Sequence, residues 1–338
     1  MFVLNSDITI DKFTGVKPND VNIKKSMYDY VDRCTIKMPI SARVKQAGKL
    51  ATESVETSKL ITEGMKVNIN LGYNGLMNNE FIGFVSRVNL TTPCEVMCEG
   101  YSYQLRKKTY LKTFVKAELI DVLKYLVDGT DIVLDKANIP SFKIEKLVLQ
   151  NHSGTEALEL IKKISDNTIN IFFTGKLLYA GLQYLVTKAD VKYTIGWNVI
   201  KDGNLKLRQA SNDNVTVNYI GEKKDGTKVK VNGKTKANVI KTSATSGNSG
   251  ETKVIKTHTV TDESTLQSMA DKKVSTLSYD GYEGKITAFL FPYCEPGYRA
   301  VLVDNKYPDR GGNYLIDSTE VSYGMSGARR TVGIAFKL

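Results

Sequence analysis

The sequence predicts a mainly β protein with an α+β insert, in which two β-barrel domains flank a small α+β domain. Three observations predict this fold class. Short segments of alternating apolar and polar residues, separated by Gly- and Asn-rich turns, occupy both ends of the chain. Segments with apolar residues at helical spacing lie between them. The 338 residues also exceed what one small core requires and fit two to three domains.

Residues 1–105 are expected to form the first barrel. Residues 33–38 alternate between apolar and polar side chains, which is typical of a half-buried strand. Residues 65–71 alternate more strictly, and a Gly-Tyr-Asn-Gly turn separates them from a further strand at 81–90, so a β-hairpin is predicted. Residues 95–105 continue the β pattern, and several short strands at this spacing indicate a barrel or sandwich.

Residues 106–200 are expected to form the α+β insert domain. A first helix is predicted from apolar residues that share one helical face: Val115, Leu119, Val122, Leu123 and Leu126. A second helix is predicted to begin at Ser153, because Ser153 and Glu156 have the spacing of a capping box.

Residues 201–338 are expected to form the second barrel. A Lys- and Gly-rich excursion at about 220–250 contains turn sequences and predicts projecting hairpins. Apolar residues at helical spacing predict a third helix at about 261–277. Further strands are predicted after this helix, and in the last of them, residues 330–338, apolar and polar residues alternate again. No repeat in the sequence establishes that the two barrels are related.

Charge and cysteine usage exclude several classes of site. The net charge is +11, but the lysines are spread along the chain without interleaved aromatic residues, so a solvated basic surface is favoured over nucleic-acid recognition. No apolar run is long enough to span a membrane. Cys94 and Cys98 lie four residues apart on a predicted strand, too far for a disulfide. His152 and His258 have no finger-like spacing to the cysteines, so neither a metal nor a cofactor is expected.

No catalytic residue is predicted, and we expect a protein without enzymatic activity. Glycoside hydrolysis needs a pair of carboxylates, for which Glu156 and Glu159 are candidates. Positions at the cap and on the polar face of a helix explain these two residues better than catalysis does. Ser326 lacks the last glycine of a nucleophile elbow, so a hairpin turn is the better interpretation. A free-standing oligonucleotide- or carbohydrate-binding β-barrel stays open as an alternative, although its candidate stacking residue, Trp197, is more typical of a core. A cell-wall hydrolase is the weakest alternative.

Two stretches carry motifs in a characteristic order. The first has a Gly-Tyr turn, a Phe-x-Gly strand and an aromatic-rich strand, with the motif positions Gly72, Tyr73, Phe81, Gly83 and Tyr101. The second has a Pro-Gly turn, a Gly-x-Tyr strand and a long hairpin, with the motif positions Pro296, Gly297, Tyr314 and Gly327. Taken in order over nearly the whole chain, they resemble the late control protein D family, the baseplate or tail-tip hub proteins of contractile-tail phages and related injection systems.

The resemblance implies a structural role. In such hubs each chain contributes two tube-like barrels, and a homotrimer forms a pseudo-sixfold ring between a sixfold tail tube and a threefold spike. The implied partners are the tail tube protein and the spike protein. The implied location is the virion tail or baseplate, assembled in the bacterial cytoplasm, with the ring lumen as a candidate route for DNA.

The lysines of the excursion have two interpretations. They could line the lumen, where three copies would focus their potential on DNA or an acidic neighbour. Alternatively they sit on outward hairpins and serve solubility, which the Gly and Asn turns favour. The residues concerned are Lys223, Lys224, Lys228, Lys230, Lys234 and Lys236.

Overall fold

A computed structural model of the chain describes residues 3–45, 52–165, 167, 169–182, 189–208 and 279–338, and the strands within 215–256 whose bounds are given below. These residues are mainly β, with short helices, and most strand pairs are antiparallel. Among them, no helix is long and apolar enough to cross a membrane.

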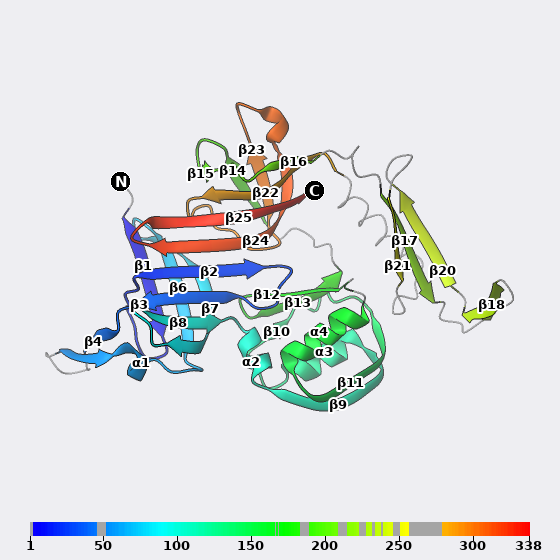
Figure 1. The fold of residues 1–338 in the computed structure, drawn as a ribbon, viewed down its shortest axis with the longest axis horizontal. Helices are drawn as coiled ribbons and strands as arrows, with labels where there is room; N and C mark the ends of the chain where they lie inside the picture. The colour runs from blue at the N-terminus through cyan, green and yellow to red at the C-terminus, as the bar shows by residue number, and fades with distance from the viewer. Residues whose placement is uncertain are drawn as a thin grey trace.

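The largest sheet has 13 strands and contains strands from both ends of the chain (Figure 1). Its main path runs β1 (Leu4–Ile10), β6 (Lys66–Tyr73), β7 (Leu76–Asn89), β8 (Cys94–Glu99), β3 (Arg33–Met38), β2 (Asp20–Ser26), β24 (Gly312–Gly324), β25 (Gly327–Lys337), β22 (Gly281–Ala288) and β15 (Val199–Lys201). Three strands lie off this path: β14 (Asp190–Thr194), β16 (Lys206–Arg208) and β23 (Arg299–Val303).

The two ends of the chain meet where β2 pairs with β24. This ladder is antiparallel and runs from the pair Asp20–Gly324 to the pair Ser26–Ser318. The predicted β-rich end regions are therefore present, but their described strands form one continuous sheet with an open order from β1 to β15, not a closed barrel. Pairing between residues almost 300 positions apart leaves no local pattern in the sequence, which is why alternation could not predict it.

A separate α+β lobe lies beside this sheet (Figure 1). It contains α2 (Ser102–Arg106), β9 (Thr109–Glu118), α3 (Leu119–Val127), β10 (Val133–Leu134), β11 (Lys143–Ser153), α4 (Gly154–Ile164), β12 (Ile169–Thr174) and β13 (Leu177–Leu182). Its core is formed by the buried faces of α3 and α4 and by apolar side chains of the surrounding strands.

Helix α3 buries Leu119, Val122, Leu123 and Leu126, as the spacing predicts. The assignment of Val115 to this helix is wrong, because Val115 lies on β9 and is 65% exposed. Strand alternation turns Phe114 inward and its neighbour outward. The predicted capping box is confirmed: the Ser153 hydroxyl accepts from the Glu156 N–H, and the Glu156 carboxylate accepts from the Ser153 N–H.

Strands β14 and β15 fall inside the predicted 106–200 unit but pair outside it. Strand β14 is parallel to β23, and β15 is antiparallel to β22, so both belong to the large sheet. Their core, which includes Tyr193 and Val199, is formed with C-terminal residues. The segment at 102–106, read as β from its alternation, is the short helix α2.

The Lys- and Gly-rich excursion contains two sheets. Strand β17 (Val215–Glu222) lies between β20 (Val239–Thr245), which is antiparallel to it, and β21 (Glu251–Lys256), which is parallel. A β-hairpin is formed by β18 (Lys228–Val231) and β19 (Lys234–Ala237). The predicted helix at 261–277 lies outside the described residues.

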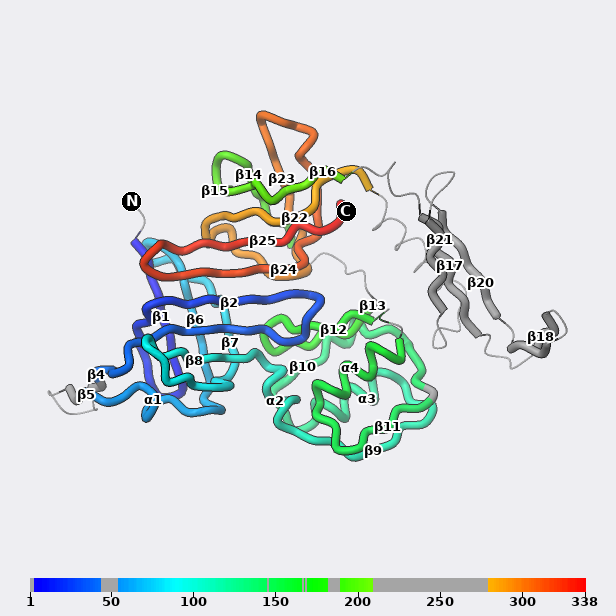
Figure 2. Tube along the Cα trace, viewed as in Figure 1, coloured from blue at the N-terminus to red at the C-terminus, as the bar shows by residue number. Residues whose placement is uncertain are grey.

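The remaining elements are short. Strands β4 (Ser41–Lys45) and β5 (Thr52–Glu56) form a hairpin that leads into α1 (Thr57–Leu60), and the 3-10 turn η2 (Pro308–Arg310) precedes β24. The colour ramp of Figure 2 shows β1–β8, in blue to cyan, next to β22–β25, in orange to red.

Candidate functional site

The two motif stretches contact each other through Tyr73. Its ring is 5% exposed and packs against Phe289 and Phe291, with centroids 6.4 and 6.2 Å away. Its hydroxyl donates a hydrogen bond to the carbonyl of Ala328, which follows Gly327 in the β24–β25 hairpin. The Gly-Tyr turn and the C-terminal hairpin are therefore one packed unit.

Gly72 and Gly83 are required by close backbone approaches. A Cβ at Gly72 would lie 1.8 Å from the carbonyl oxygen of Leu76 across the β6–β7 hairpin. A Cβ at Gly83 would lie 2.2 Å from the carbonyl oxygen of Glu99 on β8. Both contacts are far shorter than any real side chain tolerates, so the strands can pair this closely only at glycine.

The C-terminal motif positions form turns and a core. Gly297, with φ of 92°, follows the buried Pro296 and donates its N–H to the carbonyl of Ile316 at 2.8 Å. Gly327, with φ of 104°, follows the two-residue turn that contains Ser326, so the hairpin interpretation of Ser326 is confirmed. Tyr314 is fully buried, and its hydroxyl accepts the Tyr282 N–H at 3.2 Å.

Phe81 and Tyr101 belong to two different cores. Phe81 is 1% exposed in the core under β1–β8. Tyr101 is 4% exposed and lies edge-on to Phe84 at 5.6 Å, within the core of the α+β lobe. The nine motif positions thus share no single site; they hold separate cores and turns.

Sequence reasoning missed a buried charge cluster between the two ends of the chain. We use this name for Lys25, Asp32, Glu80, Glu295 and Arg330. Arg330 pairs with Glu80 at 2.7 Å, and 2% of either side chain is exposed. Arg330 also donates to the carbonyls of Leu290 and Cys294, both at 3.2 Å. This guanidinium therefore ties β25 to β7 and to the 290–295 loop.

A second ion pair continues the cluster. Lys25 pairs with Glu295 at 2.9 Å, with 10% and 11% of the side chains exposed. The Tyr293 hydroxyl donates to the same carboxylate at 2.6 Å. Burial alone would lower the pKa of Lys25, but the negative charges of Glu295, Asp32 and Glu80 raise it above its usual value.

Two acidic members of the cluster, Glu80 and Asp32, hold protons more tightly than usual. Burial raises the pKa of Glu80, although the Arg330 charge opposes the rise. Burial raises the pKa of Asp32 to about 7, with Lys25 opposing the rise and Glu295 adding to it. Asp32 itself is 5% exposed.

The sequence indicates the inward direction of Arg330 but not that of Glu80. Alternation in the last strand places Arg330 on the same face as the buried residues Val332 and Ile334, so an inward-facing arginine was readable. Glu80 has no such signal. It is the unpaired residue of a β-bulge between Asn79 and Phe81, which turns its carboxylate inward.

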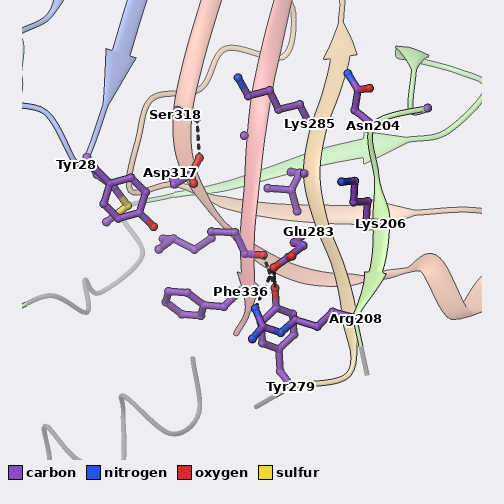
Figure 3. A pocket seen from close by; sticks show the side chains of 17 residues that line it. Tyr28, Asn204, Lys206, Arg208, Tyr279, Glu283, Lys285, Asp317, Ser318 and Phe336 are labelled. Carbon is purple, nitrogen blue, oxygen red and sulfur yellow. Dashed lines mark hydrogen bonds and ion pairs between the residues drawn. The ribbon is translucent and has the colours of Figure 1, made fainter. Parts of the chain in front are cut away.

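A groove of about 750 Å³ lies along β22, β24 and β25 (Figure 3). Arg208 pairs there with Glu283 at 3.0 Å, and the Tyr279 hydroxyl lies 3.3 Å from the same carboxylate. Asp317 accepts a hydrogen bond from the Ser318 hydroxyl at 2.6 Å, and burial raises its pKa while Ser318 and Lys285 oppose the rise. The groove is mixed in charge.

Two other candidate features, the stacking residue Trp197 and a metal site, can be compared with the structure. Trp197 is 82% exposed in a turn, so its expected core position is wrong. Its backbone N–H donates to the Thr194 carbonyl at 3.1 Å and closes the turn. Among the described residues, no group of three His, Cys, Asp or Glu side chains could hold a metal ion.

Solved structures share this fold. A 43 kDa tail protein of prophage MuSo2 from Shewanella oneidensis aligns over 99% of this chain and 98% of its own, with a TM-score of 0.63 and 12% identity. A tail protein from Neisseria meningitidis aligns over 98% and 96%, with a TM-score of 0.60 and 11% identity. An E. coli component of the type VI secretion system, described as similar to bacteriophage T4 tail proteins, aligns over 98% and 77%, with a TM-score of 0.58 and 9% identity.

No family model matches the sequence, and no curated protein matches it. The shared fold nevertheless extends over nearly the whole length of both tail proteins. The chain therefore has the fold of phage-type tail proteins. The tail-protein fold implied by the late control protein D resemblance is confirmed.

Proposed function

We propose that this chain is a structural hub protein of a phage or prophage baseplate or tail tip, which adapts a sixfold tail tube to a threefold spike. The observation that carries the proposal is the end-to-end match to a prophage tail protein, over 99% of this chain and 98% of that one. A match of this extent leaves little of the described chain for an added catalytic domain. We propose a role without catalysis accordingly.

The internal architecture supports a load-carrying role. The N-terminal and C-terminal β regions share the β2–β24 ladder, and the buried Glu80–Arg330 and Lys25–Glu295 pairs link them again through side chains. A chain that must transmit force between a tube and a spike needs its two halves fixed to each other. These contacts meet that requirement.

A homotrimer follows from the same proposal. If each chain supplies two tube-like β units, three chains supply six, which suits a sixfold tube while keeping the threefold symmetry of a spike. Closed cyclic symmetry then requires head-to-tail contacts between neighbouring units. The proposed partners are the tail tube and spike proteins, the proposed location is the virion baseplate after cytoplasmic assembly, and the lumen would pass DNA.

Three assays on the purified chain separate this function from its rivals. Light scattering at high protein concentration, alone and with the spike protein, should give three copies per particle. Binding to single-stranded DNA should be weak and should lack the steep salt dependence of a dedicated binder. Cell-wall suspensions should stay turbid.

Matched variants make the rival outcomes specific. If the wild type clears cell walls and Glu283→Gln and Asp317→Asn do not, the groove of Figure 3 is a hydrolase site and the proposal fails. If Trp197→Ala abolishes saturable binding of an oligosaccharide or oligonucleotide by a monomer, the free-standing binding module is correct. A trimer that shows neither activity supports the hub.

A further inference from the structure

The buried charge cluster contains one acid more than it can pair. Two one-to-one ion pairs use Glu80 with Arg330 and Glu295 with Lys25. Asp32 is left over: it is 5% exposed, and among the described residues it has no ion-pair partner. With all three acids ionised, the cluster would bury a net negative charge, which is strongly unfavourable away from water.

We propose that this cluster binds one proton at Asp32 and thereby acts as a pH-sensitive latch between the N-terminal and C-terminal β regions. With the proton bound, two carboxylates face two cations and the cluster is neutral. Without it, a third carboxylate competes for Lys25 and repels Glu295. The contact that loosens is the one between the β2–β3 segment and the 293–297 loop.

The geometry holds Asp32 in place. Its backbone carbonyl accepts the Gly100 N–H at 2.9 Å, and a Cβ at Gly100 would lie 3.0 Å from the Asp32 Cβ. Gly100 has no side chain, so the carboxyl of Asp32 packs closely against this backbone.

The charged groups that face Asp32 come from every neighbouring element. Strand β2 contributes Lys25, which attracts the ionised form, and the 293–297 loop contributes Glu295, which repels it. Its own loop adds opposing effects from Asp29 and Arg33, which pair with each other at 2.8 Å. Further away, Glu80 of β7 is neutralised by Arg330 of β25, and Glu99 of β8 by Arg106 at 2.8 Å. Each of these cations is paired with another acid, so none of them is left to form an ion pair with Asp32.

The balance of these effects places the pKa of Asp32 at about 7, with burial as the largest cause. The folded state then holds this proton at pH values where the unfolded chain, with a carboxyl pKa near 4, has released it. The contribution of this proton to the free energy of unfolding is complete below about pH 4 and declines as the pH rises toward 7. Above about pH 7 the contribution is absent.

Protons can reach the cluster from solvent. Lys25 lines a recess of about 220 Å³ together with Asp29, Arg33 and Lys285. Proton exchange thus requires no unfolding of the β2–β24 ladder.

The test compares the full-length wild type with Asp32→Asn, which imitates the protonated acid, and with Asp7→Asn as a matched control. Asp7 is exposed on β1. Melting temperatures are measured from about pH 5 to about pH 8. We expect the wild type and the control to lose stability over this range, and Asp32→Asn to lose distinctly less and to be the most stable of the three at the upper end. Parallel curves for all three proteins would overturn the proposal.

The titration of the Asp32 carboxyl can also be measured in the wild type itself, so that a folding defect in the variant does not affect the result. Carbon NMR of the wild type labelled at aspartate carboxyls should show one carboxyl that titrates near pH 7 and disappears in Asp32→Asn. Hydrogen exchange at the Gly100 and Gly297 amides, corrected for the intrinsic pH effect, should become up to about tenfold faster for each pH unit between about pH 5 and about pH 7, and should level off above that. If every aspartate titrates below about pH 5, or if exchange at both amides is unaffected, the latch does not exist.

Discussion

Arg330 and Glu80 lie 250 residues apart in the chain and form an ion pair of 2.7 Å from which solvent is excluded. Neither residue could be buried alone, because an unpaired charge in a protein interior is costly. Each is inward-facing for its own local reason: Glu80 at a β-bulge and Arg330 by strand alternation. The pair therefore forms only when the two ends of the chain have come together, and it makes their association specific.

Removing one partner of this pair should be severe. We expect Glu80→Gln and Arg330→Met each to lower the free energy of unfolding by about 3 kcal/mol or more, because each leaves a buried charge without its partner. The double variant should lose clearly less than the sum of the two single losses. Urea unfolding measures these values, with Lys124→Met, at the exposed Lys124–Asp121 pair, as the matched control that should cost less than about 1 kcal/mol. Equal small effects at both pairs would contradict the structural role of Arg330.

Gly83→Ala should destabilise the first β region. The added Cβ would lie 2.2 Å from the Glu99 carbonyl, so β7 and β8 must separate locally, at an expected cost of about 2 kcal/mol or more. Gly203→Ala is the control, because nothing lies within 4 Å of a Cβ there. Thermal unfolding of both variants checks the prediction, and comparable stabilities would show that the close approach is not required.

Tyr73→Phe should weaken the contact between the two motif stretches only moderately. The hydroxyl bond to the Ala328 carbonyl is lost, but Arg329 also donates to that oxygen at 2.6 Å, so the carbonyl is not left unsatisfied. We expect a loss of about 1 kcal/mol in unfolding free energy. Tyr73→Ala, which also removes the ring from Phe289 and Phe291, should lose at least about 3 kcal/mol. The same loss for both variants would mean that the ring contributes nothing.

Alkaline titration should reveal buried tyrosines. Burial, with nearby Tyr125 and Asp128, raises the pKa of Tyr110 to about 12, whereas an unfolded chain releases this proton near pH 10. Stability therefore falls as the pH rises from about 10 to about 12. At about pH 11, Tyr110→Phe should leave the tyrosinate absorbance of the folded protein almost unchanged and lower that of the urea-unfolded protein. If Tyr110→Phe lowered the tyrosinate absorbance of the folded protein by the amount of one ionised tyrosine, the burial of Tyr110 would be contradicted.

Local patterns predicted local structure well. The capping box at Ser153 and Glu156 is present as predicted, because its hydrogen bonds join residues three positions apart. The buried face of α3 follows from spacing within one element. The hairpin turn around Ser326 follows from its glycines. In each case the energy that selects the structure comes from neighbours in the sequence.

Long-range pairing is what the sequence could not predict. The cysteines illustrate this: Cys94 and Cys98 lie on one strand, β8, as predicted, but the sequence did not indicate that Cys34 on β3 lies opposite Cys98. The join of β2 to β24 and the partners of Lys25 and Glu80 depend in the same way on register between distant strands. Trp197 was misplaced because composition cannot distinguish a core aromatic from one at an exposed turn.

Cryo-electron microscopy of assembled tail particles, reconstructed without imposed symmetry, tests the proposed hub function most directly. The chain should be co-expressed with its candidate tube and spike proteins. The account predicts three copies in one closed ring between the tube and the spike, with six β units around the lumen. Particles that join tube to spike without this chain, or that carry it in a number other than three, would contradict it.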